Sequence, residues 1–213
     1  MTKFKAGATQ HGKNAVALAG EFVRWSNEMT SSIRLAAIVY EAGFPIDEFL
    51  TRAVSLLRKE RIRLGGALQE NSPGDGSRCS AMTLVDLSSR GRFRISQDLG
   101  SQAEGCRLDA QGIAEFVALL DRTPDQNVEL MLLNRFGRAE AEGGGLRFAF
   151  AHAMEAGIPV LTAVRAPYTE AWSQFHGRLA IDLPADLEVA LAWCRESVRL
   201  LRAVRHAQLS PAG

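Results

Sequence analysis

Residues 128–147 of the chain read VELMLLNRFGRAEAEGGGLR, and this stretch decides the fold. It begins with an apolar run, Val128–Leu133, which is typical of a strand buried on both faces of a parallel sheet. The chain then passes through Asn134–Gly137 and three consecutive glycines into a helical pattern from Gly145 to Gly157. The stretch therefore predicts a strand, a loop and a helix, with the strand at the centre of a sheet.

The same alternation extends on both sides of this unit. Short apolar runs predict further strands at Ile33–Tyr40, Ile62–Gln69, Thr83–Leu87, Phe93–Ser96 and Ile158–Val164, and a short segment leads from Trp172–Phe175 towards Leu179–Leu183. Helical spacing predicts helices at Ile46–Glu60, from Asp109 towards Pro124, and at Ala185–Gln208. Gly65 and Gly66 within one strand indicate a bulge or a close approach of two backbones. Strands alternating with helices predict a doubly wound α/β fold, a mostly parallel sheet with helices on both faces.

Two parts of the chain differ in composition. Residues 1–30 are expected to form a tail and one helix, and residues 31–213 a single α/β domain.

Composition narrows the classes of function. The 213 residues include 25 basic and 24 acidic side chains, a net charge of +1, so no global field favours nucleic acid or a membrane surface. The start of the chain lacks the apolar core of a signal peptide, and no apolar run approaches the roughly 20 residues of a membrane span. The three cysteines show no paired spacing, which indicates a reducing compartment. We expect a cytoplasmic protein.

The first candidate site is the loop that leaves the central strand. In open α/β sheets ligands bind beyond the carboxyl ends of the strands, where Gln69, Asn134 and Arg135 are expected. The backbone N–H groups of Gly143, Gly144 and Gly145, at the start of a helix, could bind an anion. Arg135, Arg138 and Arg147 are candidate side-chain donors to a tetrahedral oxyanion. Glu140 and Glu142 would repel that anion unless they pair with arginines or hold magnesium.

A second cluster is Gly105–Asp109. It combines the thiol of Cys106, the guanidinium of Arg107 and the carboxylate of Asp109, which is expected to cap a helix. Cys106 is either a thiol of lowered pKa before a helix or an inert buried residue, and Cys79 could lie near it. The four histidines lack metal-binding spacing, so a histidine-built metal site is not expected.

Residues 7–14, GATQHGKN, partly match a phosphate-binding Walker A loop. Asn14 replaces the Ser or Thr that would bind magnesium, and no buried strand precedes the loop. A working phosphate loop is therefore not expected there.

Four segments carry a resemblance to a known family: LNRFGRAEAEGGGLR, SQDLGSQAEGCRLD, RIRLGGALQE and IPVLTAV. Over about residues 33–183 the chain resembles the uncharacterised bacterial family called domain of unknown function 2478. Genes of that family often lie near genes for molybdate transport or molybdoenzymes, which implies a connection with molybdenum.

That family in turn is similar to P-loop nucleoside triphosphatases of the thermophile type. The resemblance implies a P-loop-like fold, with Asn134–Glu140 at the place of the acidic Walker B motif. It also implies that Tyr40–Asp47, which has no lysine, replaces the phosphate loop after the first strand. Without that lysine and with Asn134 in place of the magnesium-binding acid, fast ATP hydrolysis is not expected.

Three hypotheses of function follow. The first is a binding protein for an oxyanion or a nucleotide-like ligand in molybdenum homeostasis. Molybdate, or a nucleotide with magnesium, is the candidate ligand. Its expected site comprises Arg135, Gly143, Gly144, Gly145 and Arg147 as the grip, Asn134 and Gln69 as orienting groups, and Cys106, Arg107 and Asp109 on the opposite wall.

The other two hypotheses belong to different classes. One is a nucleoside triphosphatase or transferase that uses Glu140 or Glu142 for magnesium and Gly7–Lys13 for phosphate. The other is a regulatory or chaperone-like partner of a molybdoenzyme-related protein, or a homo-oligomer, formed through the last helix. The stripe proposed for that contact comprises Leu187, Leu191, Val198, Leu201 and Val204.

Overall fold

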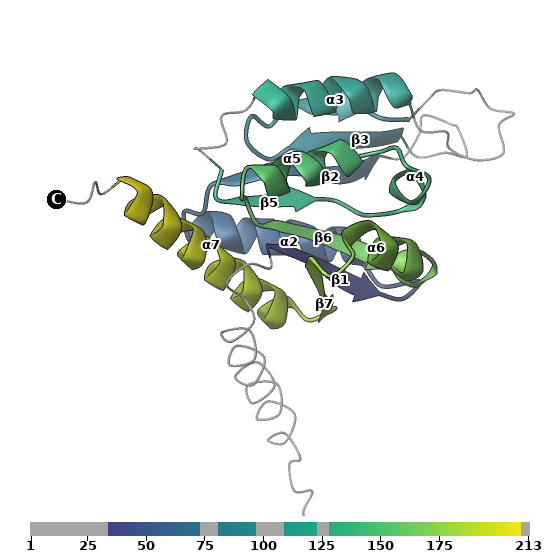
Figure 1. Cartoon of the computed structure of the whole chain (residues 1–213). Helices are drawn as coiled ribbons and strands as arrows, with labels where there is room; N and C mark the ends of the chain where they lie inside the picture. The colour runs from purple at the N-terminus through teal and green to yellow at the C-terminus, as the bar shows by residue number, and fades with distance from the viewer. Residues whose placement is uncertain (1–33, 73–80, 97–108, 123–127, 210–213) are drawn as a thin grey trace, which may run out of the picture.

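The computed structural model describes residues 34–72, 81–96, 109–122 and 128–209. Within these ranges the strands form one seven-stranded sheet in the order β4-β3-β2-β5-β6-β1-β7 (Figure 1). The strands are β1 (Leu35–Tyr40), β2 (Leu64–Ser72), β3 (Ala81–Asp86), β4 (Arg92–Arg94), β5 (Leu130–Leu133), β6 (Val160–Arg165) and β7 (Ala180–Pro184). β5, predicted from the apolar run before Asn134, occupies the middle position.

Most neighbouring strands run parallel. β5 pairs in parallel with β2 and β6, and β1 pairs in parallel with β6 and β7. β3 and β4 add an antiparallel hairpin on the outer edge of β2. The carboxyl ends of five strands consequently share one edge of the sheet.

Helices cover both faces of this sheet. α2 (Ile46–Lys59) and α7 (Leu187–Leu209) pack on one face, where they share a core with Ile38, Leu132 and Leu161. α3 (Ala110–Arg122), α5 (Arg147–Glu155) and α6 (Thr169–His176) pack on the other. Two short elements, α4 (Arg138–Ala141) and the 3₁₀ turn Ala166–Tyr168, lie beside the carboxyl edge. The predicted doubly wound α/β fold is confirmed.

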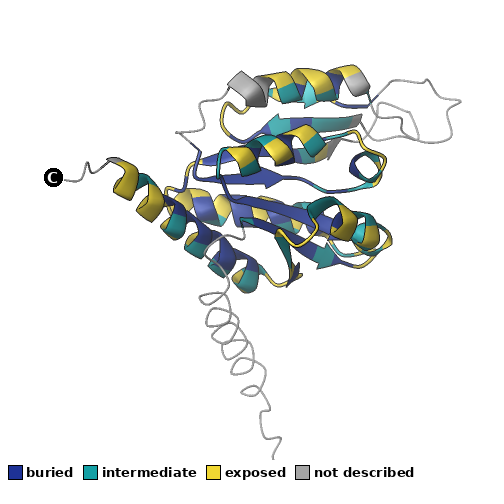
Figure 2. Cartoon of the chain, viewed as in Figure 1, coloured by how far each residue is buried: buried dark blue, intermediate teal, exposed yellow. Residues whose placement is uncertain are grey.

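Burial follows the layers. Leu35, Ala36, Ala37 and Ile38 of β1 are fully buried, as expected for a strand covered on both faces. Figure 2 shows the central strands dark blue and the outward surfaces of the helices yellow. α2 has Asp47 in its first turn and Lys59 in its last, an arrangement that suits the helix dipole.

Gly66 confirms the predicted close approach of two backbones. Its φ is +89°, and a Cβ built there would overlap the backbone carbonyl of Leu132 on the neighbouring strand β5. Only glycine fits this position without moving either strand.

The apolar stripe of α7 packs largely on its own sheet. Leu191, Val198 and Leu201 are buried, whereas Val204 is 41% exposed. Most of the stripe that was proposed to contact a partner is therefore buried in the core of this chain. None of the described helices is long and apolar enough to cross a membrane.

Candidate functional site

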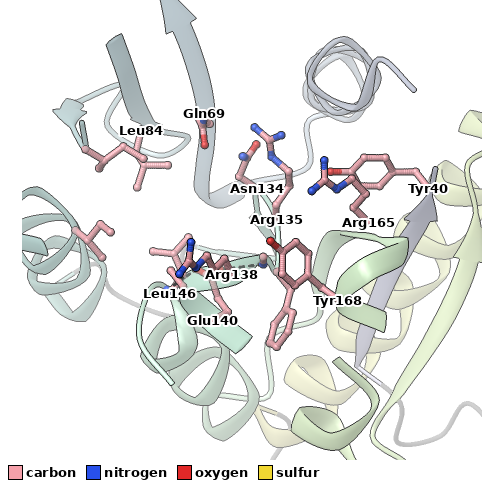
Figure 3. Close-up of a pocket in the computed structure, with 15 residues that line it drawn as sticks. Tyr40, Gln69, Leu84, Asn134, Arg135, Arg138, Glu140, Leu146, Arg165 and Tyr168 are labelled. Atoms are coloured by element: carbon pink, nitrogen blue, oxygen red, sulfur yellow. Dashed lines mark hydrogen bonds between the residues drawn. The ribbon is translucent and has the colours of Figure 1, made fainter. Parts of the chain in front are cut away.

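A cavity of about 280 Å³ opens at the carboxyl edge of the sheet. Tyr40 ends β1, Asn134 and Arg135 follow β5, and Arg165 ends β6, so three neighbouring parallel strands deliver these side chains to one place. Figure 3 shows the cavity with its lining side chains: Tyr40, Gln69, Leu84, Ile95, Ile113, Asn134, Arg135, Phe136, Gly137, Arg138, Ala139, Glu140, Leu146, Arg165 and Tyr168. The cavity lies where doubly wound sheets bind their ligands.

Asn134 is the most unusual polar residue of the cavity. It is only 3% exposed, and its carboxamide oxygen Oδ1 is buried without a hydrogen-bond partner among the described residues. Gln69, from the adjacent strand β2, places a second carboxamide on the lining. A buried polar group without a partner costs free energy, so Asn134 is a candidate for contact with a ligand.

Three guanidinium groups surround the same cavity. Arg135 lies 3.2 Å from the carboxylate of Asp47 on α2, and Arg138 lies 2.7 Å from Glu142. Arg165 stands over the ring of Tyr168, with its Cζ 5.9 Å from the ring centroid. Two of the three cations are thus balanced by acids that are themselves partly exposed, and such pairs are weak enough for an anion to compete with them.

A second cavity of about 310 Å³ adjoins the first. Its lining comprises Tyr40, Gly43, Phe44, Pro45, Ile46, Asp47, Glu48, Arg135 and Arg165. The turn between β1 and α2 forms one wall, at the place of the phosphate loop of a P-loop protein, and it contains no lysine. Tyr40, Arg135 and Arg165 belong to both linings, and we call the two neighbouring cavities together the cleft.

The glycine-rich loop after α4 surrounds a carboxylate of the protein itself. The backbone N–H of Gly137 donates to Oε2 of Glu140, and the N–H of Leu146 donates to Oε1, each at 2.9 Å. Gly145 has a φ of +61°, and a Cβ there would overlap this carboxylate. Glu140 is 7% exposed and its two oxygens are held by these backbone donors, so it is poorly placed to bind magnesium.

The remaining predicted site residues are distributed as follows. Gln69, Asn134 and Arg135 line the cavity, and Gly143, Gly144, Gly145 and Arg147 do not. The N–H groups of Gly143 and Gly144 donate to backbone carbonyls, and Arg147 donates to the carbonyl of Glu140 while its Cζ stands 4.7 Å from the ring centroid of Phe175.

Asp109 also stands apart from the cavity lining. Its carboxylate accepts the N–H of Gln111, as expected at the start of α3. Cys79, Cys106, Arg107 and the Gly7–Lys13 loop lie outside the described residues. Within the described part of the chain, no three His, Cys, Asp or Glu residues gather as a metal site.

Sequence reasoning did not select several lining residues. Tyr40 is the last residue of β1, so the strand-end rule could have found it. Tyr168 comes from the 3₁₀ turn after β6, and Leu84, Ile95 and Ile113 come from more distant elements. Nothing in their local sequence distinguishes those side chains from ordinary core residues.

Comparisons with known proteins identify a curated relative. The chain is 38% identical over 173 residues to the protein named molybdenum import ATP-binding protein ModC 2 from Bradyrhizobium diazoefficiens. The match covers 81% of this chain and 19% of that protein, so the chain spans about a fifth of the length of this relative.

Two solved structures share the fold. One is the human cancer-related nucleoside triphosphatase, with a TM-score of 0.52, 14% identity and coverage of 84% of this chain and 100% of that one. The other is THEP1 from Aquifex aeolicus, with a TM-score of 0.52, 14% identity and coverage of 78% of this chain and 98% of that one. The fold is thus P-loop-like, although lysine is absent from the turn after β1. The model of the family described as "Protein of unknown function (DUF2478)" matches residues 35–193, and the chain belongs to that family.

Proposed function

We propose that this protein binds a small anionic ligand at the carboxyl edge of its sheet and does not hydrolyse nucleoside triphosphates. The observation that carries the proposal is the cleft itself, where three guanidinium groups line one cavity. Guanidinium groups bind phosphate and related oxyanions through paired hydrogen bonds. Arg135, which belongs to both parts of the cleft, is the central binding group.

The residues of the cleft lack what phosphoryl transfer requires. A P-loop enzyme grips the phosphates with a lysine and a ring of backbone N–H groups, and binds magnesium through a hydroxyl and an acid. Here the turn after β1 has no lysine, and an amide, Asn134, follows the central strand. Glu140 is held by backbone donors, and Glu142, which pairs with Arg138 at the surface, lines neither cavity.

The name of the ModC relative supports a molybdenum context. That protein is described as part of molybdenum import, and this chain matches about a fifth of it. Molybdate is a tetrahedral oxyanion, which suits guanidinium donors. We therefore place the protein in molybdenum homeostasis, with molybdate as the first ligand to test.

A thermal-shift series on the desalted full chain tests the proposal. The ligands are molybdate, tungstate, sulfate and phosphate, and ATP and GTP with and without magnesium. A ligand that binds only the folded state raises the unfolding midpoint. We expect a shift with at least one anion in the absence of magnesium, and its loss in Arg135→Ala.

Arg199→Ala is the matched control, because Arg199 forms an exposed ion pair with Glu196 on α7. This control variant should retain the shift. Failure of every anion to shift the wild-type midpoint, or an unchanged shift in Arg135→Ala, contradicts the proposal.

A second candidate function is a nucleoside triphosphatase, because one structural neighbour is a protein named as a nucleoside triphosphatase. Its phosphate grip would have to come from outside the cleft, and Lys13 in the Gly7–Asn14 segment is the candidate. Phosphate release from ATP and GTP with magnesium measures this activity directly. Release by the wild type that Lys13→Ala abolishes would establish the triphosphatase in place of the binding protein.

A further inference from the structure

The cleft is larger than an inorganic oxyanion needs. Its two parts measure about 280 and about 310 Å³, each near the lower limit of pockets for organic ligands, roughly 300–1,000 Å³. A water molecule takes about 30 Å³ in the liquid, and a tetrahedral oxyanion is only a few times larger. Such an ion, placed at Arg135, would leave most of the cleft to solvent.

A group of apolar side chains forms one wall of the first cavity. Leu84 and Ile95 from the β3–β4 side, Ile113 from α3 and Leu146 before α5 face the first cavity together with Phe136. Leu84, Ile95, Phe136 and Leu146 are at most 5% exposed. Apolar walls contribute nothing to the binding of an inorganic ion, but they stabilise the body of an organic ligand.

Asn134 adds a requirement for a hydrogen-bond donor. Its Oδ1 is an acceptor buried without a partner among the described residues. A deprotonated oxyanion offers only acceptors, so it cannot satisfy this oxygen. A ligand that carries N–H or O–H groups can, and the carboxamide of Gln69 on the next strand offers a second donor–acceptor group in the same cavity (Figure 3).

These three observations point to one class of ligand. We infer that the cleft binds an organic anion in which a planar ring with N–H and C=O groups is joined to a phosphate or carboxylate. The anionic group lies at Arg135 and Arg165, and the ring lies between the apolar wall and the Asn134 carboxamide. This inference rests on the proposed function, since it uses the same arginines, and it names the class of ligand.

A set of phosphate ligands with and without a ring distinguishes the contribution of the ring to the binding affinity from that of the charge. Isothermal titration calorimetry on the full chain, without magnesium, would compare GMP, AMP and UMP with ribose 5-phosphate, which has the phosphate and no heterocyclic ring. Inorganic phosphate and molybdate complete the set. We expect at least one ring-bearing phosphate to bind about ten-fold or more tightly than ribose 5-phosphate, a difference of about 1.4 kcal/mol.

Two variants test whether this difference in affinity arises in the ring compartment, the part of the first cavity between the apolar wall and Asn134. Asn134→Leu keeps the approximate side-chain volume and removes the carboxamide, and Ile113→Trp adds a larger side chain to the cavity lining from α3. Each should reduce the preference for the ring-bearing phosphate over ribose 5-phosphate to less than about three-fold. Circular dichroism checks that each variant is folded.

The outcomes distinguish this inference from the proposed function. If phosphate or molybdate binds and no ring-bearing phosphate exceeds ribose 5-phosphate, the ring compartment is disproved and the anion site stands. If a preference exists and both folded variants retain it, the placement of the ring at Asn134 is wrong. If no anion binds at all, the proposed function fails as well.

Discussion

The guanidinium of Arg135 lies 3.2 Å from the carboxylate of Asp47, on the wall that the two parts of the cleft share. Both side chains are partly accessible, with 30% of Arg135 and 38% of Asp47 exposed. An anion that binds Arg135 must therefore compete with a carboxylate of the protein. The pair gives a direct way to strengthen binding by mutation.

Asp47→Asn should raise the affinity of the cleft for phosphate or molybdate by about 1.4- to five-fold. The expected gain follows from the modest strength of partly exposed ion pairs, about 0.2–1 kcal/mol. Calorimetric titration measures the change. Glu196→Gln is the control, because it breaks another ion pair on α7, distant from the cleft, and should leave affinity unchanged. Unchanged or weaker binding in Asp47→Asn would show that the anion does not use Arg135.

Glu140 and Glu142 stand two residues apart, and truncation of Glu140 should destabilise the protein more than truncation of Glu142. Glu140→Ala leaves the backbone N–H groups of Gly137, which is half-buried, and of Leu146, which is buried, without their acceptor. At about 1.5–3 kcal/mol for a hydrogen bond to a charged group, the free energy of unfolding should fall by at least about 2 kcal/mol. Glu142→Ala removes only an exposed pair with Arg138 and should cost less than about 1 kcal/mol. Urea denaturation compares the two, and equal costs would refute the role given to Glu140.

Gly66 and Gly43 form a second matched pair, because both have a positive φ, +89° and +88°. A Cβ at Gly66 would overlap the carbonyl of Leu132, whereas a Cβ at Gly43 meets no atom within 4 Å. Gly43→Ala should therefore cost only the backbone strain, about 1–2 kcal/mol. Gly66→Ala adds a clash between two central strands and should cost more than about 3 kcal/mol or prevent folding. Thermal unfolding of both variants checks the order, and a smaller loss for Gly66→Ala would contradict it.

The layers of the fold could be predicted from the sequence because a buried strand appears in the sequence as a run of apolar residues. Four consecutive buried residues in β5, Leu130–Leu133, appear as an apolar run, and the Gly66 contact appears as a glycine inside a strand. Residues at the ends of such runs could be placed at one edge by the topology rule alone. Asn134 and Arg135 were found in this way.

The details of the site could not be predicted because they depend on contacts between distant residues. An acid beside three glycines can hold a metal, pair with an arginine or accept backbone N–H groups, and only the fold shows that Glu140 does the last. Arg147 likewise seemed available for a ligand, but it reaches the carbonyl of Glu140 and the ring of Phe175. Tyr168 lines the cavity from a short 3₁₀ turn, and no motif in the sequence predicts the conformation of that turn.

Far from the cleft, Glu129 joins the start of β5 to α7. It is 2% exposed, accepts the N–H of Arg63 at 3.0 Å, and receives two hydrogen bonds from Arg202 at 2.8 and 3.0 Å. Burial opposes the ionisation of Glu129, but the hydrogen bonds from Arg202 and Arg63 outweigh it, so its pKa lies below the usual 4.5. The sequence analysis placed Glu129 in the predicted strand Val128–Leu133. In the structure its carboxylate binds Arg202 of the last helix, α7.

Glu129 should therefore make the stability of the protein depend on pH. A carboxyl whose pKa is lower in the folded state than in the unfolded state stabilises the fold fully above the unfolded value, about 4.5, and this stabilisation disappears as the pH falls through the folded pKa. Glu129→Gln should lower the free energy of unfolding near neutral pH by about 1.5–3 kcal/mol. Its stability should then fall less steeply than that of the wild type below about pH 4.5. Glu196→Gln, which removes an exposed pair with Arg199, should change the neutral-pH value much less. Urea denaturation at a series of pH values measures both effects, and parallel curves for the wild type and Glu129→Gln would exclude Glu129 as the titrating group.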